Sequence, residues 1–315
     1  MPLRFTLRQL EYLVAVGETG SIARAAERLH VSSPSISAAI AQLEAELALP
    51  LFARRHAHGL VLTQAGRRVL DQARAVLAEA ARLNALTGEI AGQVGGPLSV
   101  GCLLTFAQIL LPHIRRGFVA RYPAIRFAQH ERDQQAIFEG LRDGALDVAL
   151  TYDLDLPPDL LFTPLFDLPP YALLPETHPL AGRRSLSPAD LAPHPMVLLD
   201  LPHSAPYFLS LFAQAGVSPQ VAERTRDMEV MKTLVANGFG YSIANIRHAS
   251  DRAADGKRLR FIPLSGEARP MRMGWLATEA ASQGLSVRAL IAHCRESLSP
   301  ALPPGLAPFH ASDDR

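Results

Sequence analysis

The sequence predicts a chain of two unlike parts: an N-terminal helical domain with a small β-hairpin and, beyond one long helix, an α/β region with parallel strands. Three observations predict this. Apolar residues recur at helical spacing up to Leu47, and an alanine-rich helical pattern follows from Gln64 to about Gly92. Beyond Gly95-Gly96-Pro97, short strand patterns alternate with helical ones, an order typical of parallel sheets.

Composition narrows the class of protein. The 315 residues suffice for two or three domains, and 48% hydrophobic with 19% charged residues is ordinary for a globular protein. We expect a cytoplasmic protein with no membrane partner, because the chain has neither a long uncharged apolar run nor a signal-peptide pattern. The net charge of +1 does not itself indicate nucleic acid, but residues 47–70 hold four arginines and no acidic residue. That segment predicts a local cationic surface.

The first helix has a clear start. Thr6 and Gln9 have the spacing of a capping box, and Phe5 and Leu10 have that of a hydrophobic staple. We therefore expect a helix from about residue 7, whose apolar side packs against the segment that follows it.

Residues 21–47 predict two short helices joined by a tight turn at residues 30–32. Ser21 is a plausible N-cap of the first helix, and the second begins at Ser33 with Pro34 in its first turn. Ile36, Ile40, Leu43 and Leu47 mark the buried side of the second helix. The opposite side is small and uncharged, which is typical of a helix-turn-helix whose second helix enters the DNA major groove. The alternative is a helical hairpin in an ordinary core.

Five short motifs follow one another along the N-terminal domain, at residues 10–16, 20–26, 32–37, 51–54 and 62–66. In identity and spacing they resemble the winged helix-turn-helix of LysR-type transcriptional regulators. The resemblance implies a sequence-specific DNA-binding regulator whose partner is double-stranded DNA. Two short apolar segments around Gly59 fit the wing, a β-hairpin.

The DNA-contact candidates lie on the second helix and at the edge of the wing: Ser33, Pro34, Ser35, Ser37, Gln42, Arg54 and Arg55. Serine and glutamine can bond base edges, and the arginines can meet phosphates or a minor groove. Two solvated arginines are the alternative. Ser33 stands where the family often has glutamine, and Ala38 where it often has a polar residue. We therefore expect specificity to depend more on phosphate contacts, the wing and DNA shape.

A heptad pattern runs along the alanine-rich helix: Val69, Ala73, Val76, Ala80, Leu83, Thr87 and Ile90. Such a seam is typical of a coiled coil, and it resembles the linker helix through which LysR-type regulators dimerise. The predicted partner is a second copy of the chain, in a dimer or a tetramer. The alternative is a helix packed on its own domain.

Beyond Leu98 the expected strands are residues 98–102, 126–130, 147–151 and 196–199, and the expected helices are residues 105–121, 134–142, 205–215, 229–237 and 287–297. The proline-rich segment 156–170 should cross into a second lobe, and residues 271–276 should return to the first. This layout resembles the two-lobed effector domain of the same family, which is like a periplasmic binding protein. The predicted domains are residues 1–63 for DNA binding, 64–93 for the linker helix, 97–168 with 270–299 for lobe I, 169–269 for lobe II, and 300–315 as a disordered tail.

An effector site is expected between the lobes, where strand ends and helix starts converge. Thr105 and Ser204 are predicted to cap two helices aimed at this cleft, which favours an anion such as a small carboxylate. The candidates are Cys102, Leu103, Thr105, His130, Thr151, Pro202, His203 and Ser204. Helix caps are needed without any ligand, so a purely structural role for each is the alternative.

The sequence thus predicts a transcriptional regulator whose small-molecule effector changes how two DNA half-sites are engaged, with RNA polymerase as a further partner of an activator. The rival is a solute-binding module with a vestigial DNA-binding domain. An enzyme is disfavoured because nucleophile-elbow, phosphate-loop and zinc-protease motifs are missing. No cofactor and no metal site are predicted. Cys102 and Cys294 are expected to be packed residues rather than a redox switch.

Overall fold

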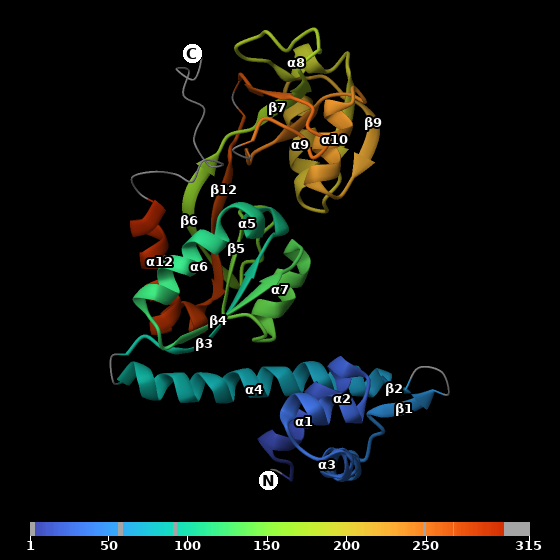
Figure 1. Ribbon diagram of the computed structural model, residues 1–315, viewed down its shortest axis with the longest axis vertical. Helices are drawn as coiled ribbons and strands as arrows, with labels where there is room; N and C mark the ends of the chain where they lie inside the picture. The colour runs from blue at the N-terminus through green and yellow to red at the C-terminus, as the bar shows by residue number, and fades with distance from the viewer. Residues whose placement is uncertain (1–3, 56–58, 91–92, 248–249, 267, 299–315) are drawn as a thin grey trace.

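The computed structural model describes residues 4–55, 59–90, 93–247, 250–266 and 268–298. The helical N-terminal domain lies at one end with the long helix α4, and two α/β lobes follow (Figure 1). No helix within these residues is long and apolar enough to span a membrane. The predicted tail, residues 300–315, lies outside the described residues.

The N-terminal domain has the predicted winged helix-turn-helix. Helices α1 (Leu7–Thr19), α2 (Ile22–Leu29) and α3 (Ser33–Leu47) are followed by an antiparallel hairpin of β1 (Phe52–Arg55) and β2 (Gly59–Leu62). The Thr6–Gln9 capping box opens α1, and the Ser21 side chain accepts a hydrogen bond from Arg24 N at the start of α2. Ser32 caps α3, and proline stands in the first turn as expected. Local sequence signals therefore determine all three helix starts.

Helix α4 (Gln64–Ile90) serves two purposes along its length. Leu70 and Ala73 are buried in the core of the N-terminal domain, and Val69 and Val76 pack against that core. Within one chain, the first half of the predicted seam therefore packs on its own domain, which is the alternative that the sequence left open. Leu83, further along, is 65% exposed.

Lobe I is built on a five-stranded sheet of order β4-β3-β5-β12-β6. Strand β3 (Gly96–Cys102) is parallel to β4 (Ile125–Glu131) and β5 (Val148–Tyr152), and β12 (Met271–Thr278) returns antiparallel between β5 and β6 (Leu160–Leu168). The helices of this lobe are α5 (Leu104–Ile109), α6 (Leu111–Arg121), α7 (Gln134–Arg142), α11 (Glu279–Gln283) and α12 (Leu285–Leu298).

Two expectations for lobe I are corrected. The single helix predicted over residues 105–121 is broken at Leu110, because Pro112 in the first turn of α6 has no N–H to continue the hydrogen-bond ladder of α5. The proline-rich segment predicted as a crossing contains the strand β6. Its Pro164 is compatible with that position because β6 is an edge strand.

Lobe II holds β7 (Tyr171–Pro175), β10 (Ser242–Ala244) and β11 (Leu259–Pro263) in one sheet, and the parallel pair β8 (Pro195–Leu199) and β9 (Gln220–Thr225) in another. A bridge between Met196 and Tyr241 joins them. The helices are α8 (Pro188–Leu191), α9 (Ser204–Gln214) and α10 (Met228–Ala236). The chain passes between the lobes twice, from β6 to β7 and from β11 to β12.

Candidate functional site

The exposed side of α3 is the candidate nucleic-acid surface. Pro34, Ser35, Ser37 and Gln42 are exposed and Ser33 is half-buried, whereas Ile36, Ile40 and Leu43 are buried on the opposite side. The apolar residues hold the helix against α1 and α2, so its small, uncharged side is left for a partner.

Local hydrogen bonds distinguish these candidates. The hydroxyls of Ser32 and Ser35 bond each other at 2.7 Å, and Gln42 Nε2 donates to Glu46 Oε1 at 3.2 Å. Within the described residues no such bond engages the Ser37 hydroxyl. The Ser33 hydroxyl has no such bond with the described residues either, but Ser33 is half-buried, so Ser37 is the exposed serine of α3 that can bond DNA without first giving up an intramolecular partner.

The wing follows α3 in sequence, and Arg54 and Arg55 are the last two residues of its first strand, β1. Arg54 pairs with Leu60 and Arg55 with Gly59 in the hairpin register, and the side chains of both arginines lie outside the described residues. Arg67 and Arg68 are exposed in the first turns of α4, and Arg67 Nη1 donates to Leu62 O at 3.0 Å.

Sequence analysis missed one ion-pair network in this domain. Glu18 Oε2 accepts from Arg28 Nη1 at 2.6 Å and Glu18 Oε1 from Arg74 Nη2 at 3.2 Å, so one carboxylate joins α1, α2 and α4. Burial alone would raise the pKa of Glu18, but the hydrogen bonds from Arg28 and Arg74 lower it overall. No local sequence pattern predicts this contact, because Glu18 and Arg74 are 56 residues apart in the sequence.

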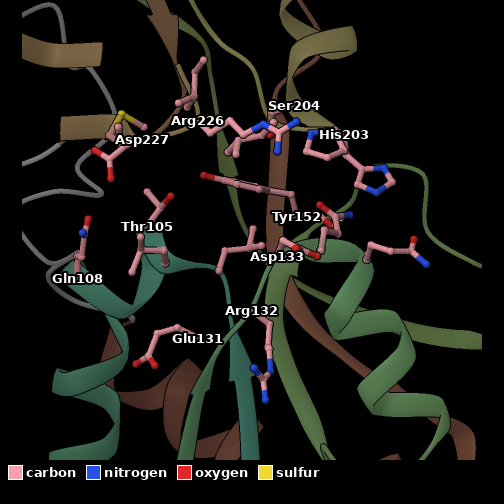
Figure 2. Close-up of a pocket in the computed structure, with 18 residues that line it drawn as sticks. Thr105, Gln108, Glu131, Arg132, Asp133, Tyr152, His203, Ser204, Arg226 and Asp227 are labelled. Atoms are coloured by element: carbon pink, nitrogen blue, oxygen red, sulfur yellow. Dashed lines mark hydrogen bonds between the residues drawn. The ribbon is translucent and has the colours of Figure 1, made fainter. Parts of the chain in front are cut away.

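A cavity of about 330 Å³ opens between the lobes (Figure 2). From lobe I it is lined by the carboxyl ends of β4 and β5 and the starts of α5 and α7. From lobe II it is lined by the end of β8 and the starts of α9 and α10. Strand ends and helix starts thus meet there, as predicted from the alternating pattern.

Five of the eight predicted effector residues line this cavity: Leu103, Thr105, Pro202, His203 and Ser204. Cys102, His130 and Thr151 do not. Cys102 and Thr151 are fully buried, and each is followed by a residue that lines the cavity, Leu103 and Tyr152. His130 likewise precedes Glu131, a lining residue at the end of β4. Side chains alternate between the faces of a strand, so in each case the next residue along the chain is the one that lines the cavity.

The two predicted caps are wrong. Helix α5 begins at Leu104 with Leu103 at the N-cap position, and α9 begins at Ser204 with His203 there, neither with a side-chain cap. Thr105 and Ser204 lie inside the first turn, because each helix starts at least one residue earlier than predicted. Their hydroxyls are then not placed to accept from the first-turn N–H groups.

Aspartates cap the other two helices at the cavity. Asp133 accepts from Ala136 N at 2.8 Å at the start of α7, and Asp227 accepts from Glu229 N at 2.8 Å at the start of α10. These carboxylates are engaged by their own helices. The local signal, an Asp just before an apolar periodic segment, could have identified both positions in the sequence.

Tyr152 and Arg226 are the most informative lining residues that sequence analysis missed. Tyr152 is only 7% exposed, packs against Phe106 with ring centroids 4.8 Å apart, and makes no side-chain hydrogen bond with the described residues. Burial raises its pKa, so the hydroxyl stays neutral. Arg226 lies on the lobe II side near Ser204 and has no ion pair within the described residues, whereas Arg132 points away from the cavity (Figure 2).

Leucines, Pro202 and Met228 supply much of the apolar wall, and the polar residues Gln108, Glu131, Gln134 and Gln135 also line the cavity. His203 Nδ1 lies 3.1 Å from Asp155 Oδ2, which pairs one cavity residue with a loop of lobe I. No cluster of three or more metal-ligating side chains occurs in the described part of the chain. Cys102 and Cys294 are both fully buried, and burial raises the pKa of each thiol to about 12.

Comparisons with known proteins cover nearly the whole chain. Residues 7–67 match the family described as bacterial regulatory helix-turn-helix protein, lysR family, and residues 91–299 match the LysR substrate binding domain. The DNA-binding transcriptional dual regulator OxyR of Escherichia coli (strain K12) is 32% identical over 238 residues, which are 75% of this chain and 78% of that protein.

Two solved structures extend the likeness to the three-dimensional fold. HinK, a LysR family transcriptional regulator from Pseudomonas aeruginosa, is 33% identical with a TM-score of 0.63, over 93% of this chain and 99% of that chain. Full-length CbnR complexed with its target DNA is 25% identical with a TM-score of 0.67, over 93% of this chain and 100% of that one.

Proposed function

The chain belongs to the LysR family of DNA-binding transcription regulators, and we propose that a small organic anion bound between its lobes controls its DNA binding. The observation that carries the proposal is the interlobe cavity, which is lined by the nearly buried Tyr152 and by Arg226, whose guanidinium has no ion pair within the described residues. The Tyr152 hydroxyl has no hydrogen-bond partner among the described residues, so a ligand or water in the cavity can bond it.

The chemistry of the cavity favours a carboxylate with an apolar body. Asp133 and Asp227 are engaged as caps, His203 pairs with Asp155, and the Arg132 side chain points away, so within the described part of the chain Arg226 is the cation left to meet an anionic group (Figure 2). A guanidinium binds a carboxylate with two parallel hydrogen bonds. Tyr152, Thr105 and Ser204 would add hydroxyl contacts, and Leu103, Leu201 and Met228 would contact the apolar part. The case for an anion thus depends on Arg226 and the hydroxyl groups. It no longer depends on helix caps by Thr105 and Ser204, because α5 and α9 lack them.

Hydrogen peroxide is a second candidate signal, because several similar proteins are named hydrogen peroxide-inducible genes activator. A thiol sensor needs an accessible thiolate. The two cysteines of this chain are buried and their thiol pKa values are raised to about 12. The cavity chemistry therefore supports a bound organic anion better than thiol oxidation.

At the DNA, α3 would enter the major groove with Ser33, Pro34, Ser35, Ser37 and Gln42 toward the bases and backbone, and Arg54 and Arg55 of the wing would contact phosphates or a minor groove. Two such domains would be joined through the second half of α4, where Leu83 is exposed. At promoters that it activates, the bound protein would contact RNA polymerase. We propose no catalytic activity; the named relatives are transcription regulators.

The test begins with a genomic pull-down by the purified protein at moderate salt. We expect enrichment of a dyad-symmetric site, and loss of that enrichment in Ser37→Glu, because a carboxylate would face the phosphates. The rival solute-binding module requires that no DNA be retained. The genes beside the enriched site suggest which organic acids to test. Each acid is then added to the complex of the protein with the recovered DNA fragment, and the change in DNA affinity is measured.

Arg226→Ala should weaken the response to the active acid by at least about tenfold, since it removes a charge-assisted pair. Arg132→Ala is the matched control, because that guanidinium points away from the cavity (Figure 2). Equal effects of the two substitutions would remove Arg226 from the site.

A further inference from the structure

Two crossovers hold the lobes together, so their backbones set the angle between the lobes. One runs from β6, which ends at Leu168, to β7; the other runs from β11 through Arg269 to β12. Strands β6 and β12 pair along their whole length and lead toward lobe II side by side (Figure 1). Any side chain that bonds both crossovers can therefore restrain the angle between the lobes.

Two side chains of lobe II make those bonds. Tyr207, on α9, donates its hydroxyl to Arg269 O at 2.8 Å. Asn245, just after β10, donates Nδ2 to the Tyr207 hydroxyl at 3.2 Å and to Leu168 O at 2.7 Å. One phenol and one amide thus connect both crossovers to the same lobe.

A buried carboxylate of lobe I holds the second crossover from the other side. The Asp153 side chain, 3% exposed, accepts at Oδ2 from Arg269 Nη2 and Arg272 Nε, both at 2.7 Å, and at Oδ1 from Arg272 N at 2.8 Å. Arg269 is consequently bonded through its carbonyl to lobe II and through its guanidinium to lobe I. We call Asp153, Tyr207, Asn245, Arg269 and Arg272 the hinge network.

The hinge network reaches the cavity through α9. His203 and Ser204 line the cavity, and Tyr207 follows Ser204 by three residues, about 4.5 Å along the helix axis. His203 also pairs with Asp155, two residues beyond Asp153. A ligand that moves the start of α9 therefore acts on Tyr207 one turn later, because a helix moves as a rigid unit.

We propose that Tyr207 is a positioning residue that couples occupation of the cavity to the angle between the lobes, through its bond to Arg269 and the Asp153 pair beyond it. The regulatory meaning of this inference rests on the proposed ligand site. The hydrogen bonds that restrain the angle between the lobes are present in the chain without ligand. Directional hydrogen bonds are either made or broken, and the bond from Asn245 to Leu168 O is buried, so the hinge network favours two discrete lobe arrangements over a continuum.

The test is hydrogen–deuterium exchange of the full-length protein, without ligand, followed by mass spectrometry. Tyr207→Phe removes one hydroxyl and leaves the ring. We expect the amides in and beside the crossovers, among them Leu264 N–H, which donates to Pro170 O, and Arg272 N–H at the start of β12, to exchange about fivefold faster, the change that the loss of one ordinary hydrogen bond causes in an opening equilibrium. Asn245→Ser should act in the same direction, and its effect is read at the Leu264 N–H bonded to Pro170 O, because Pro169 and Pro170 between β6 and β7 have no N–H to exchange. Tyr241→Phe is the matched control, since that phenol is buried in lobe II and its hydroxyl has no partner within the described residues.

The outcomes separate this inference from the proposed function. Faster exchange confined to the crossovers in Tyr207→Phe, with a changed footprint on the recovered DNA fragment, supports the coupling. Equal crossover exchange in Tyr207→Phe and Tyr241→Phe overturns it, and so does faster exchange throughout lobe II, which would show a merely structural role. If no organic acid alters DNA binding while Tyr207→Phe still loosens the crossovers, the ligand proposal fails and the hinge network stands.

Discussion

At the scale of single residues, carboxylates fasten elements that the chain brings together from a distance. Glu44 Oε1 accepts from the backbone N–H groups of Leu51 and Phe52 at 2.6 and 3.1 Å, which fixes where the wing leaves α3. Glu18 does the same for three helices through Arg28 and Arg74. Hydrogen bonds to a charged acceptor are stronger than neutral ones, so each carboxylate contributes to a specific geometry.

Glu18 leads to a prediction about pH. Its folded pKa lies below the ordinary value of 4.5, so its contribution to stability is present above that pH and is lost as the pH falls through the folded pKa. We expect Glu18→Gln to lower the stability of the N-terminal domain at pH 7 by less than about 1 kcal/mol, since the group is partly exposed. Thermal melting at pH 7 and below pH 4 measures this. A deficit of equal size at both pH values would contradict the assignment.

The buried thiols give a second prediction at this scale. At neutral pH a thiol whose pKa is raised to about 12 has almost no thiolate, and Cys102 and Cys294 have no exposed surface. We expect neither to be alkylated by iodoacetamide in the folded protein and DNA affinity to be unchanged by hydrogen peroxide. Mass spectrometry before and after denaturation measures the labelling. Rapid labelling of the folded protein would contradict this prediction and would support the hypothesis that a thiol senses hydrogen peroxide.

At the scale of elements, the junction between the wing and α4 depends on a glycine. A Cβ at Gly66 would lie 2.0 Å from Leu51 O, which is backbone and cannot move aside. We expect Gly66→Ala to destabilise the N-terminal domain by about 1–3 kcal/mol, as overpacking does elsewhere. Chemical denaturation measures the change. Gly182→Ala is the control, because no atom lies within 4 Å of its Cβ position. An equal loss of stability in Gly182→Ala would show that the contact between Gly66 and Leu51 is not the cause.

Helix α4 presents an exposed leucine where dimerisation is proposed. Leu83→Asp should convert dimers to monomers in light scattering without lowering the melting temperature of the N-terminal domain, because Leu83 is 65% exposed. Val76→Asp should damage the domain itself, since Val76 packs against its core. An unchanged mass for Leu83→Asp would place the interface elsewhere.

The elements that local signals specify could be predicted from the sequence, and those that depend on distant contacts could not. Ser21 and Thr6 cap helices as expected, because capping needs only neighbours along the chain. Thr105 and Ser204 carry the same signal, yet α5 and α9 begin before they can cap. The strand β6 was hidden by its proline, which an edge position permits.

At the scale of the whole molecule, the site depends on contacts that no sequence window contains. The cavity position follows from the alternation of strands and helices, and five of eight predicted residues line it. Tyr152 was missed because it is the last residue of β5, and Arg226 because it lies in the short connection between β9 and Asp227, the N-cap of α10. Asp153 and Arg272 are 119 residues apart, so the hinge network becomes visible only when β12 returns beside β5.

The salt dependence of DNA binding tests how the parts act together. Each neutralised phosphate lowers the slope of log K against log salt by about 0.9. The cationic surface of one N-terminal domain is modest, so tight binding requires two domains held by one dimer. Leu83→Asp should therefore reduce the slope to about half and weaken binding, because a monomer engages only one set of phosphates. Leu161→Asp is a suitable control, since Leu161 is also an exposed leucine, at 47%, but lies on β6 of lobe I. Fluorescence anisotropy on the recovered fragment between 50 and 200 mM salt, roughly the range over which such contacts act, gives both slopes. A full slope from a monomeric Leu83→Asp protein would mean that one domain makes all the phosphate contacts, and the linker helix would then serve spacing rather than affinity.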